Sequence, residues 1–128
     1  LKFIDPDFAK IVVDADDEVV GFGLAVPSLA EALQRTRGRV FPFGLLRLRH
    51  AVKFPKRLDL LLVGVRPDYQ GKGLPAVLMS EITRCSLLRG VIDAETNPEL
   101  EDNVLVQSIW KEYGRRQHKR RRCFIKDL

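Results

Sequence analysis

Two short apolar runs near the start of the chain have the composition of paired β-strands. Residues 9–13 and 18–26 are rich in valine and other apolar residues, and the polar run Asp14-Ala15-Asp16-Asp17 separates them. Short apolar runs joined by a few polar residues are typical of hairpins. The pattern therefore predicts an antiparallel hairpin with a four-residue loop.

The next segment is predicted to be an insertion at about residues 28–57. Pro27 ends the second strand, Ser28 is a candidate cap for a short helix over residues 29–36, and Gly38 is placed to end that helix. Residues 39–57 show no clean hydrophobic period. We expect an ordered segment there, with a helical turn near residues 45–53.

A strand, a turn and a helix follow directly on one another in the middle of the chain. Residues 58–65 are apolar on both faces, as in a central strand that is covered on both sides. From Leu74 the apolar residues keep helical spacing until Gly90, a residue suited to end a helix. The pattern predicts a buried strand that turns into a long amphipathic helix.

The remaining elements complete the predicted fold class. Residues 91–94 are a candidate short strand, Asn103 is a candidate helix cap, and residues 122–128 alternate in the manner of a final strand. This order is typical of α+β proteins with a mixed, mostly antiparallel sheet flanked by helices. We expect one domain over residues 1–128. Because the chain starts at Leu1 and not at Met, we expect it to be a piece of a longer protein.

Charge comes in blocks, which bears on possible partners. The net charge is +5, but residues 35–57 hold eight basic and no acidic residues, and residues 115–128 hold seven basic residues and one acidic residue. Basic blocks can steer phosphate-bearing ligands, although a solvated face is the commoner explanation. Phe124 is the only aromatic residue adjoining the tail run, so the sequence offers no stacking array and makes a nucleic-acid partner unlikely.

Other classes of protein are disfavoured by the composition. Cys85 and Cys123 have no CxxC spacing and no clustered histidines, which argues against a metal site and against a disulfide framework. No apolar run approaches the roughly 20 residues that span a bilayer. We therefore expect a cytoplasmic setting, no metal and no membrane partner.

The turn between the central strand and the long helix carries the clearest chemical signal. Gly71 and Gly73 flank Lys72 just before the helix begins. Glycine lets the backbone approach a ligand closely, and the free N–H groups of a helix start favour an anion. The spacing indicates a phosphate or pyrophosphate cradle, although tight strand-to-helix turns also use glycine for steric reasons alone.

Two motifs give the chain a resemblance to a known family. The motif Q-x-x-G-x-P, which begins at Gln70 and follows V-x-P-x-Y from Val65, resembles the Gln/Arg-x-x-Gly-x-Gly/Ala signature of the GNAT (Gcn5-related N-acetyltransferase) superfamily. The motif N-x-x-V-x-x-I-W-x-x-x-G, which begins at Asn103, is similar to the family's second motif. The resemblance covers the chain from Ala9 onward, and the family's first strand and first two helices have no counterpart here.

The resemblance implies an N-acyltransferase that uses acetyl-CoA or another acyl-CoA as co-substrate and an amine of unknown identity as acceptor. It implies that main-chain groups of Val63 and Val65 bond the pantetheine arm, and that Asn103 bonds the cofactor as well as capping its helix. The residues that it places around the coenzyme A pyrophosphate are Gln70, Gly71, Lys72, Gly73 and Leu74.

Two departures from the family pattern bear on the chemistry. Pro75 stands where the family has Gly or Ala, and proline has no N–H to offer a phosphate. Trp110 replaces the tyrosine that many members use as general acid, and Tyr113 is a substitute only if it does not belong to the core stripe of its helix.

A general base is needed to take a proton from the amine, and Asp59 is the first candidate. It interrupts the apolar central strand, at a spacing where a catalytic glutamate stands in the histone-acetylating branch of the family. An even separation puts Asp59 on the same face as Val63 and Val65 unless a bulge intervenes, and Gly64 would suit a bulge. An exposed charge at the strand start is the equal alternative, and Glu95 is a second candidate.

Two other functions stay open at this point. Pro75 and Trp110 are compatible with a catalytically degenerate GNAT-like module that has only a binding or structural role. The basic run of residues 115–122 would give such a module a surface for nucleic acid.

Overall fold

The structure is a computed structural model that describes residues 4–41 and 43–126. The chain divides into two compact units, Leu1–Thr96 and Asn97–Leu128. Within the described residues no helix is long and apolar enough to cross a membrane.

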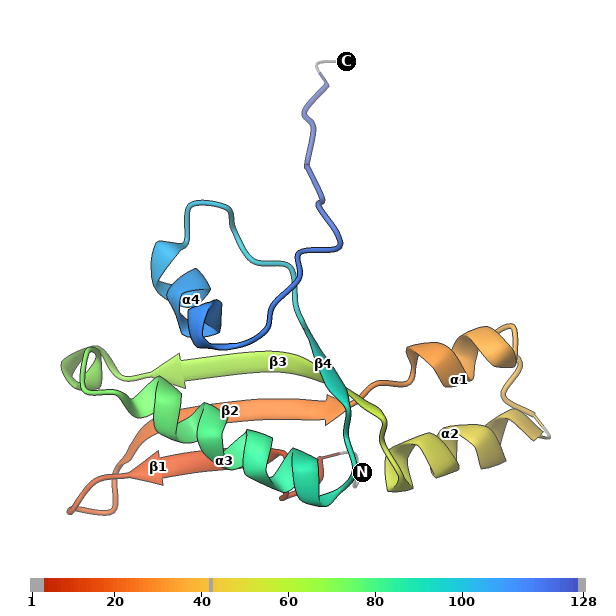
Figure 1. The fold of residues 1–128 in the computed structure, drawn as a ribbon, viewed down its shortest axis with the longest axis horizontal. Helices are drawn as coiled ribbons and strands as arrows, with labels where there is room; N and C mark the ends of the chain where they lie inside the picture. Colours follow the sequence, from red (N-terminus) through yellow and green to blue (C-terminus); the bar gives the residue numbers. More distant parts are fainter. Residues whose placement is uncertain (1–3, 42, 127–128) are drawn as a thin grey trace. The chain divides into compact units, whose positions relative to one another are not determined.

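The first unit is built on a four-stranded sheet in the order β1-β2-β3-β4 (Figure 1). The strands are β1 (Ala9–Val13), β2 (Val19–Pro27), β3 (Arg57–Val65) and β4 (Asp93–Thr96). The pairs β1–β2 and β2–β3 are antiparallel, whereas β3 and β4 run parallel. The predicted α+β class with a mixed, mostly antiparallel sheet is confirmed, and β4 begins two residues later than the sequence pattern indicates.

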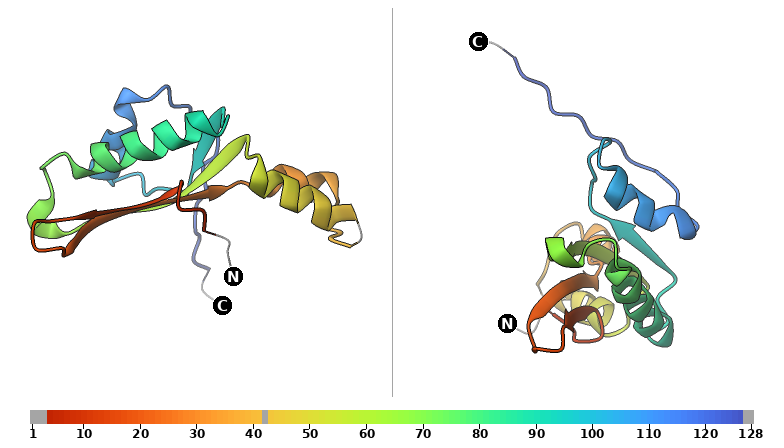
Figure 2. Two further views of the ribbon diagram at one scale, coloured as in Figure 1. Left: turned by 90° about the horizontal axis from the view of Figure 1, so that it is seen from below. Right: turned by 90° about the vertical axis from the view of Figure 1, so that its left-hand side faces the viewer.

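The helix α3 (Leu74–Leu88) covers one face of the sheet (Figure 2). β2 presents glycines to it: a Cβ atom on Gly23 would lie 2.9 Å from the side chain of Ile82, so the helix approaches the strand more closely than a larger residue allows. The core that results contains the buried residues Phe8, Ala25, Leu58, Ile82 and Val91. Each large apolar side chain buried there contributes about 1.5–3 kcal/mol.

The insertion between β2 and β3 forms two helices, α1 (Ala30–Arg35) and α2 (Phe43–Lys53). The helical segment predicted at residues 45–53 is confirmed and begins two residues earlier. The predicted cap at Ser28 is wrong: the helix is capped at Leu29 without a side-chain hydrogen bond, and the Ser28 N–H donates to the Arg57 carbonyl at 2.9 Å. Ser28 therefore closes the base of the insertion.

The second unit contains α4 (Val104–Ile109) and a 3-10 turn, η2 (Trp110–Glu112). The capping role predicted for Asn103 is confirmed, since its Oδ1 accepts a hydrogen bond from the Val106 N–H at 3.3 Å. The predicted final strand is wrong for residues 122–126, which form no strand, and residues 127–128 lie outside the described residues. Alternation alone does not make a strand without a partner that offers hydrogen bonds.

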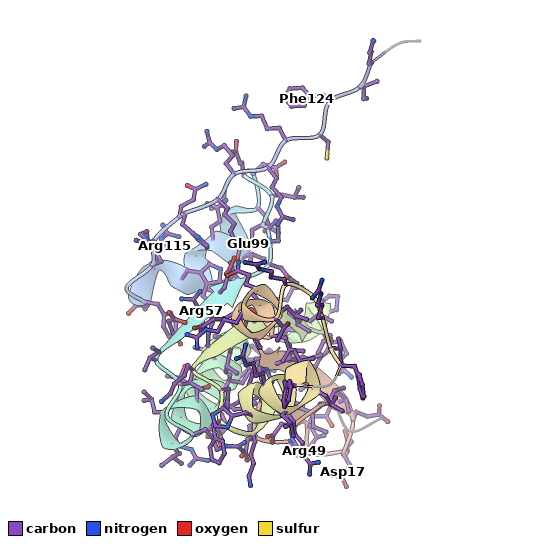
Figure 3. The ribbon with its side chains drawn as sticks, turned by 90° about the vertical axis from the view of Figure 1, so that its right-hand side faces the viewer. Asp17, Arg49, Arg57, Glu99, Arg115 and Phe124 are labelled. Atoms are coloured by element: carbon purple, nitrogen blue, oxygen red, sulfur yellow. The ribbon has the colours of Figure 1, made fainter. Side chains whose placement is uncertain are left out.

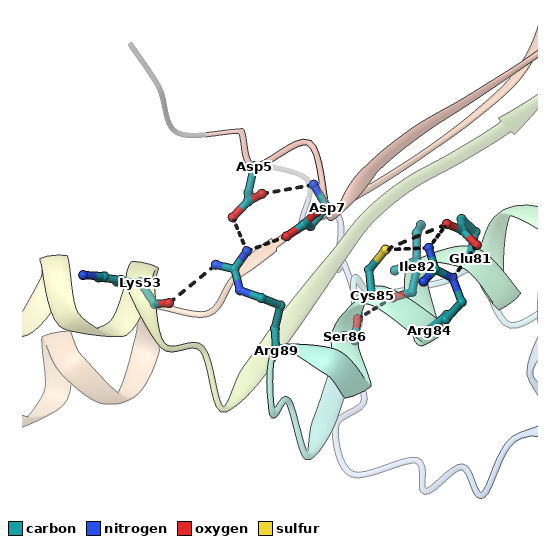
Figure 4. Close-up of polar contacts among 9 residues, drawn as sticks. All are labelled: Asp5, Asp7, Lys53, Glu81, Ile82, Arg84, Cys85, Ser86 and Arg89. Carbon is teal, nitrogen blue, oxygen red and sulfur yellow. Dashed lines mark hydrogen bonds and ion pairs between the residues drawn. The ribbon is translucent and has the colours of Figure 1, made fainter.

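A cluster around Arg89 ties three segments of the first unit together (Figure 4). The Arg89 guanidinium lies 2.5 Å from an Asp7 oxygen and 3.2 Å from an Asp5 oxygen, and it also reaches the Lys53 carbonyl at 3.5 Å. It lies over the ring of buried Phe8, 5.5 Å from the centroid. The end of α3 is thereby joined to the start of the chain and to the end of α2.

Arg89→Ala is expected to lower the free energy of unfolding by about 1–2 kcal/mol, because it removes a network of charges and a cation–π contact at once. The matched control is Arg84→Ala. Arg84 forms an exposed ion pair with Glu81 one helical turn away, and such a pair contributes about 0.5 kcal/mol. Denaturant titration of both variants checks this. Equal losses for the two variants would show that the Arg89 cluster does not anchor the fold.

Candidate active site

The loop between β3 and α3 adopts two left-handed turns at its glycines. A short 3-10 turn, η1 (Pro67–Tyr69), leads to Gly71 with φ +75° and Gly73 with φ +78°, and Gly73 is the N-cap of α3. Residues with a Cβ atom adopt this conformation at a cost of about 1–2 kcal/mol. The backbone conformation therefore favours glycine at both positions.

This loop leaves a set of amide donors free for a ligand. Within the described part of the chain, the N–H groups of Gly71, Lys72, Gly73 and Leu74 donate to no acceptor, whereas the Ala76 N–H already donates to the Gly73 carbonyl at 3.0 Å. A Cβ atom built on either glycine meets nothing within 4 Å, so the space in front of these amides is open. The donor set and the helix start suit an anion such as a pyrophosphate.

The side chain of Tyr69 fastens the loop to the hairpin turn. Its hydroxyl donates to Asp14 Oδ2 at 3.1 Å, and the cationic groups of Arg66 and Lys72 lie 4.8 Å and 4.4 Å from its ring centroid. The Asp14 Oδ1 also accepts the Glu18 N–H at 3.0 Å. Sequence reasoning missed Asp14, which lies 55 residues before its tyrosine partner and shows only the signature of a turn residue.

The charges of this link are set by their hydrogen bonds. The backbone N–H of Glu18 is the main cause that lowers the pKa of Asp14, and the hydrogen bond to Asp14 raises the pKa of Tyr69. Arg66 forms two hydrogen bonds to Asp68, at 2.8 and 2.9 Å, and lowers the pKa of that carboxyl group. At neutral pH Asp14 is an anion and Tyr69 is a neutral donor, which is the state that holds the loop.

The pairing between β3 and β4 ends about halfway along β3. Their parallel ladder pairs Arg57 with Asp93 and ends where Leu60 pairs with Thr96, whereas the ladder between β2 and β3 continues to Val65. The stretch of β3 from Val63 to Val65 thus lies beyond the ladder with β4. A strand in this situation can accept an extended ligand along its free side.

A bulge in β3 determines which way Asp59 faces. The register with β2 shifts between Leu24 and Ala25, which pair with Leu62 and Leu60, so Leu61 is the extra residue. Because paired residues share a face, Val63 and Val65 lie on the α3 face with Gly23 and Gly21, and Asp59 lies on the opposite face with Val26.

Two sequence expectations are corrected by this register. The bulge intervenes between Asp59 and Val63, so Asp59 does not share a face with the two valines. The bulge is at Leu61 and not at Gly64, whose Cβ position lies 2.6 Å from the ring of Phe22 on the neighbouring strand. Gly64 is explained by the close approach of this aromatic ring from β2.

The two candidate bases are neighbours across the sheet. Asp59 and Glu95 are paired residues of the parallel β3–β4 ladder, and both are half-buried. They lie one residue before the point where the ladder ends. Sequence reasoning weighed these carboxylates as alternatives, and the structure places them side by side on one face.

In the second unit the aromatic residues contact each other. The Trp110 indole Nε1 donates to Glu99 at 2.6 Å, and its ring lies edge-on to Tyr113 at 6.2 Å between centroids. Tyr113 is 39% exposed. It is therefore a partly exposed residue and not a member of a buried stripe.

Comparison with known structures settles the fold. An aminoglycoside N-acetyltransferase, AAC(6')-Iy, solved with CoA, is 17% identical and superposes with a TM-score of 0.59 over 94% of this chain and 75% of its own. AAC(6')-Ih of Acinetobacter baumannii is 12% identical with a TM-score of 0.56, over 94% of this chain and 69% of its own. An acetyltransferase of Trypanosoma brucei is 18% identical with a TM-score of 0.54, over 94% and 68%. The chain has the GNAT fold.

Among curated proteins, this chain matches parts of two longer proteins. It is 30% identical to Protein YghO of Escherichia coli K12 over 134 residues, all of this chain and 34% of that protein. It is 28% identical to the Bacterial ceramide synthase of Caulobacter vibrioides over 121 residues, 90% of this chain and 32% of that protein. The chain therefore spans about a third of the length of these relatives. No family model matches it.

The GNAT fold confirms the resemblance that the two motifs indicate. Pro75, the departure in the first motif, is the second residue of α3, where a missing N–H removes one donor and leaves the helix intact. Trp110, the departure in the second, uses its indole N–H on Glu99. The loop keeps four free amide donors, and Tyr113, partly exposed and three residues after Trp110, stays the candidate for general acid.

Proposed function

We propose that this chain is the coenzyme A-binding portion of an acyl-CoA-dependent N-acyltransferase. The observation that carries the proposal is the group of four free amides, Gly71 to Leu74, presented by left-handed glycines at the start of α3. The GNAT fold and neighbours that were solved with CoA support the same ligand.

In this proposal the loop and the free side of β3 bind different parts of the cofactor. The amides of Gly71, Lys72, Gly73 and Leu74 hold the pyrophosphate, with the Lys72 ammonium as an added positive charge and Gln70 at the loop entrance. Main-chain groups of Val63 and Val65 bond the pantetheine arm beyond the β3–β4 ladder. Asn103 caps α4 in the structure, and its contact with the cofactor stays a prediction. Bound acyl-CoA supplies the acyl group as an activated thioester.

Asp59 is proposed to accept the proton that the amine loses. It stands about 20 Å along β3 from Val65, given the rise of a strand, next to the point where β3 and β4 part. Glu95, its paired residue across the β3–β4 ladder, is the second candidate base beside it. The pair combines half-buried carboxylates with a position at the end of the β3–β4 ladder, and a carboxylate within reach of the acceptor amine can take its proton.

The acceptor is proposed to be the amine of a long-chain amino alcohol. One relative that covers 90% of this chain is named a ceramide synthase, and a ceramide is an N-acylated amino alcohol with a long alkyl chain. That name describes acyl transfer to nitrogen, the reaction for which the loop and the carboxylate pair are suited.

The test uses the full-length protein from which this chain comes, with acetyl-CoA and palmitoyl-CoA as donors. Long-chain amino alcohols and aminoglycosides serve as acceptors, and mass spectrometry detects the amide. We expect the amide of the amino alcohol. Acyl-CoA binding without any amide would identify a degenerate binding module, and acylation of the aminoglycoside alone would overturn the acceptor class.

A further inference from the structure

The α1–α2 insertion exposes an unusual number of large apolar side chains. Phe41 is 87% exposed, Phe43 is 74% exposed and Leu46 is 65% exposed. The other exposed large apolar residues of this segment are Leu33, Val40, Leu45 and Phe54. Single exposed apolar residues are common on protein surfaces, but a group of this size in one segment marks an interaction surface.

The same segment carries positive charge that the protein does not neutralise. Arg35 pairs with Glu31, and Arg57 pairs with Asp93. Across the ranges that the structure describes, the remaining basic side chains have no carboxylate partner; these are Arg37, Arg39, Arg47, Arg49, Lys53 and Lys56. Figure 3 shows Arg49 on the insertion. Apolar and cationic groups are therefore interspersed on one exposed segment.

The insertion is fixed at its base and open beyond it. Pairing of Pro27 with Leu58 holds one end, and the hydrogen bond that Arg89 donates to the Lys53 carbonyl holds the other. α2 contacts α1 through Arg47, whose Nη1 donates to the Arg35 carbonyl at 3.4 Å, and a Cβ atom on Gly44 would collide with the Arg39 carbonyl in the connection between the two helices. Figures 1 and 2 show the two helices side by side, beyond the end of the sheet and clear of α3. The segment is thus a firm projection and not a loose loop.

We propose that the α1–α2 insertion binds the surface of a membrane that contains anionic lipids. Basic side chains with phenylalanine and leucine beside them are the composition that places a helix in the headgroup layer: the cations meet the lipid phosphates, and the apolar side chains enter the acyl boundary. A nucleic acid would satisfy the cations but would leave the leucines and valines in water. The proposal adds a peripheral membrane contact where the sequence alone indicates no membrane partner, and it stands independently of acyl transfer.

Flotation with lipid vesicles tests this on the protein as it exists. We expect binding to vesicles of phosphatidylcholine mixed with phosphatidylglycerol, and little binding to phosphatidylcholine alone. Phe41→Ser with Phe43→Ser should weaken binding at least tenfold. Arg47→Gln with Arg49→Gln should weaken it about 25-fold, at roughly fivefold per cation, and added salt should have the same effect.

Two matched double variants serve as controls, with circular dichroism to confirm folding. Leu87→Ser with Leu88→Ser removes exposed apolar residues from α3, and Arg121→Gln with Arg122→Gln removes cations from the tail. Both should bind vesicles as the parent does. The proposal is overturned if anionic vesicles do not bind, if the controls weaken binding as much, or if the Arg47 and Arg49 variant loses only binding to a short DNA duplex.

Discussion

Asp59→Asn in the full-length protein is expected to lower kcat for acyl transfer by about 100-fold or more, with affinity for acyl-CoA little changed. Asparagine keeps the shape of the side chain but cannot accept a proton. The carboxylate lies far from the amide cradle, about 20 Å along β3, so its loss removes a step of the reaction and leaves cofactor binding intact. Steady-state kinetics combined with calorimetry separate the two effects.

The dependence on pH makes this test specific for a base. The loss should shrink as pH rises, because more of the acceptor amine is then already deprotonated. Asp16→Asn, in the exposed hairpin turn, is the matched control and should keep full activity. Glu95→Gln should cost less than Asp59→Asn. Unchanged kcat for Asp59→Asn between about pH 6 and about pH 9 would assign the proton to Glu95 or to water instead.

The turn between β3 and α3 was predictable because its signals are local, and its role as a cradle stays a prediction. Glycines two apart, directly after an apolar strand and before a helical period, indicate a tight turn, and in the structure Gly71 and Gly73 both have positive φ. The ends of α3 follow from the same kind of signal, since Gly90 with φ +73° ends it as expected.

The orientation of the candidate base was not predictable, because it depends on pairing between strands. Nothing in the apolar run of residues 58–65 distinguishes a strand with an extra residue at Leu61 from a regular one, and a single extra residue turns Asp59 to the other face. The link between Asp14 and Tyr69 is of the same kind, since only the fold brings a turn and a distant loop together.

The start of α2 illustrates a different limit. Its sequence has no clean amphipathic period, because Phe43, Leu45 and Leu46 are apolar yet exposed while Gly44 is buried. Hydrophobic periodicity detects helices that pack on a core, so it fails for a helix that turns apolar residues outward. The feature that obscures the helix is also the one that supports a lipid-facing insertion.

Gly73→Val is expected to abolish detectable binding of acetyl-CoA. Gly73 has φ +78° as the N-cap of α3, and a β-branched residue disfavours that conformation by about 1–2 kcal/mol or more. No atom lies within 4 Å of the new Cβ position, so the change adds no internal clash. The valine redirects the amides and fills the space in front of them. It should therefore weaken pyrophosphate binding and leave the packing of the core unchanged.

Calorimetric titration of acetyl-CoA into the parent, Gly73→Val and Gly38→Val tests whether the loop between β3 and α3 binds coenzyme A. Gly38 has φ +75° and equally open surroundings but lies in the insertion, so Gly38→Val carries the same backbone cost away from the cradle. We expect binding by the parent, nearly equal binding by Gly38→Val, and none by folded Gly73→Val. Parent-like affinity in Gly73→Val, or no binding by the parent, would contradict the assignment of this loop to coenzyme A.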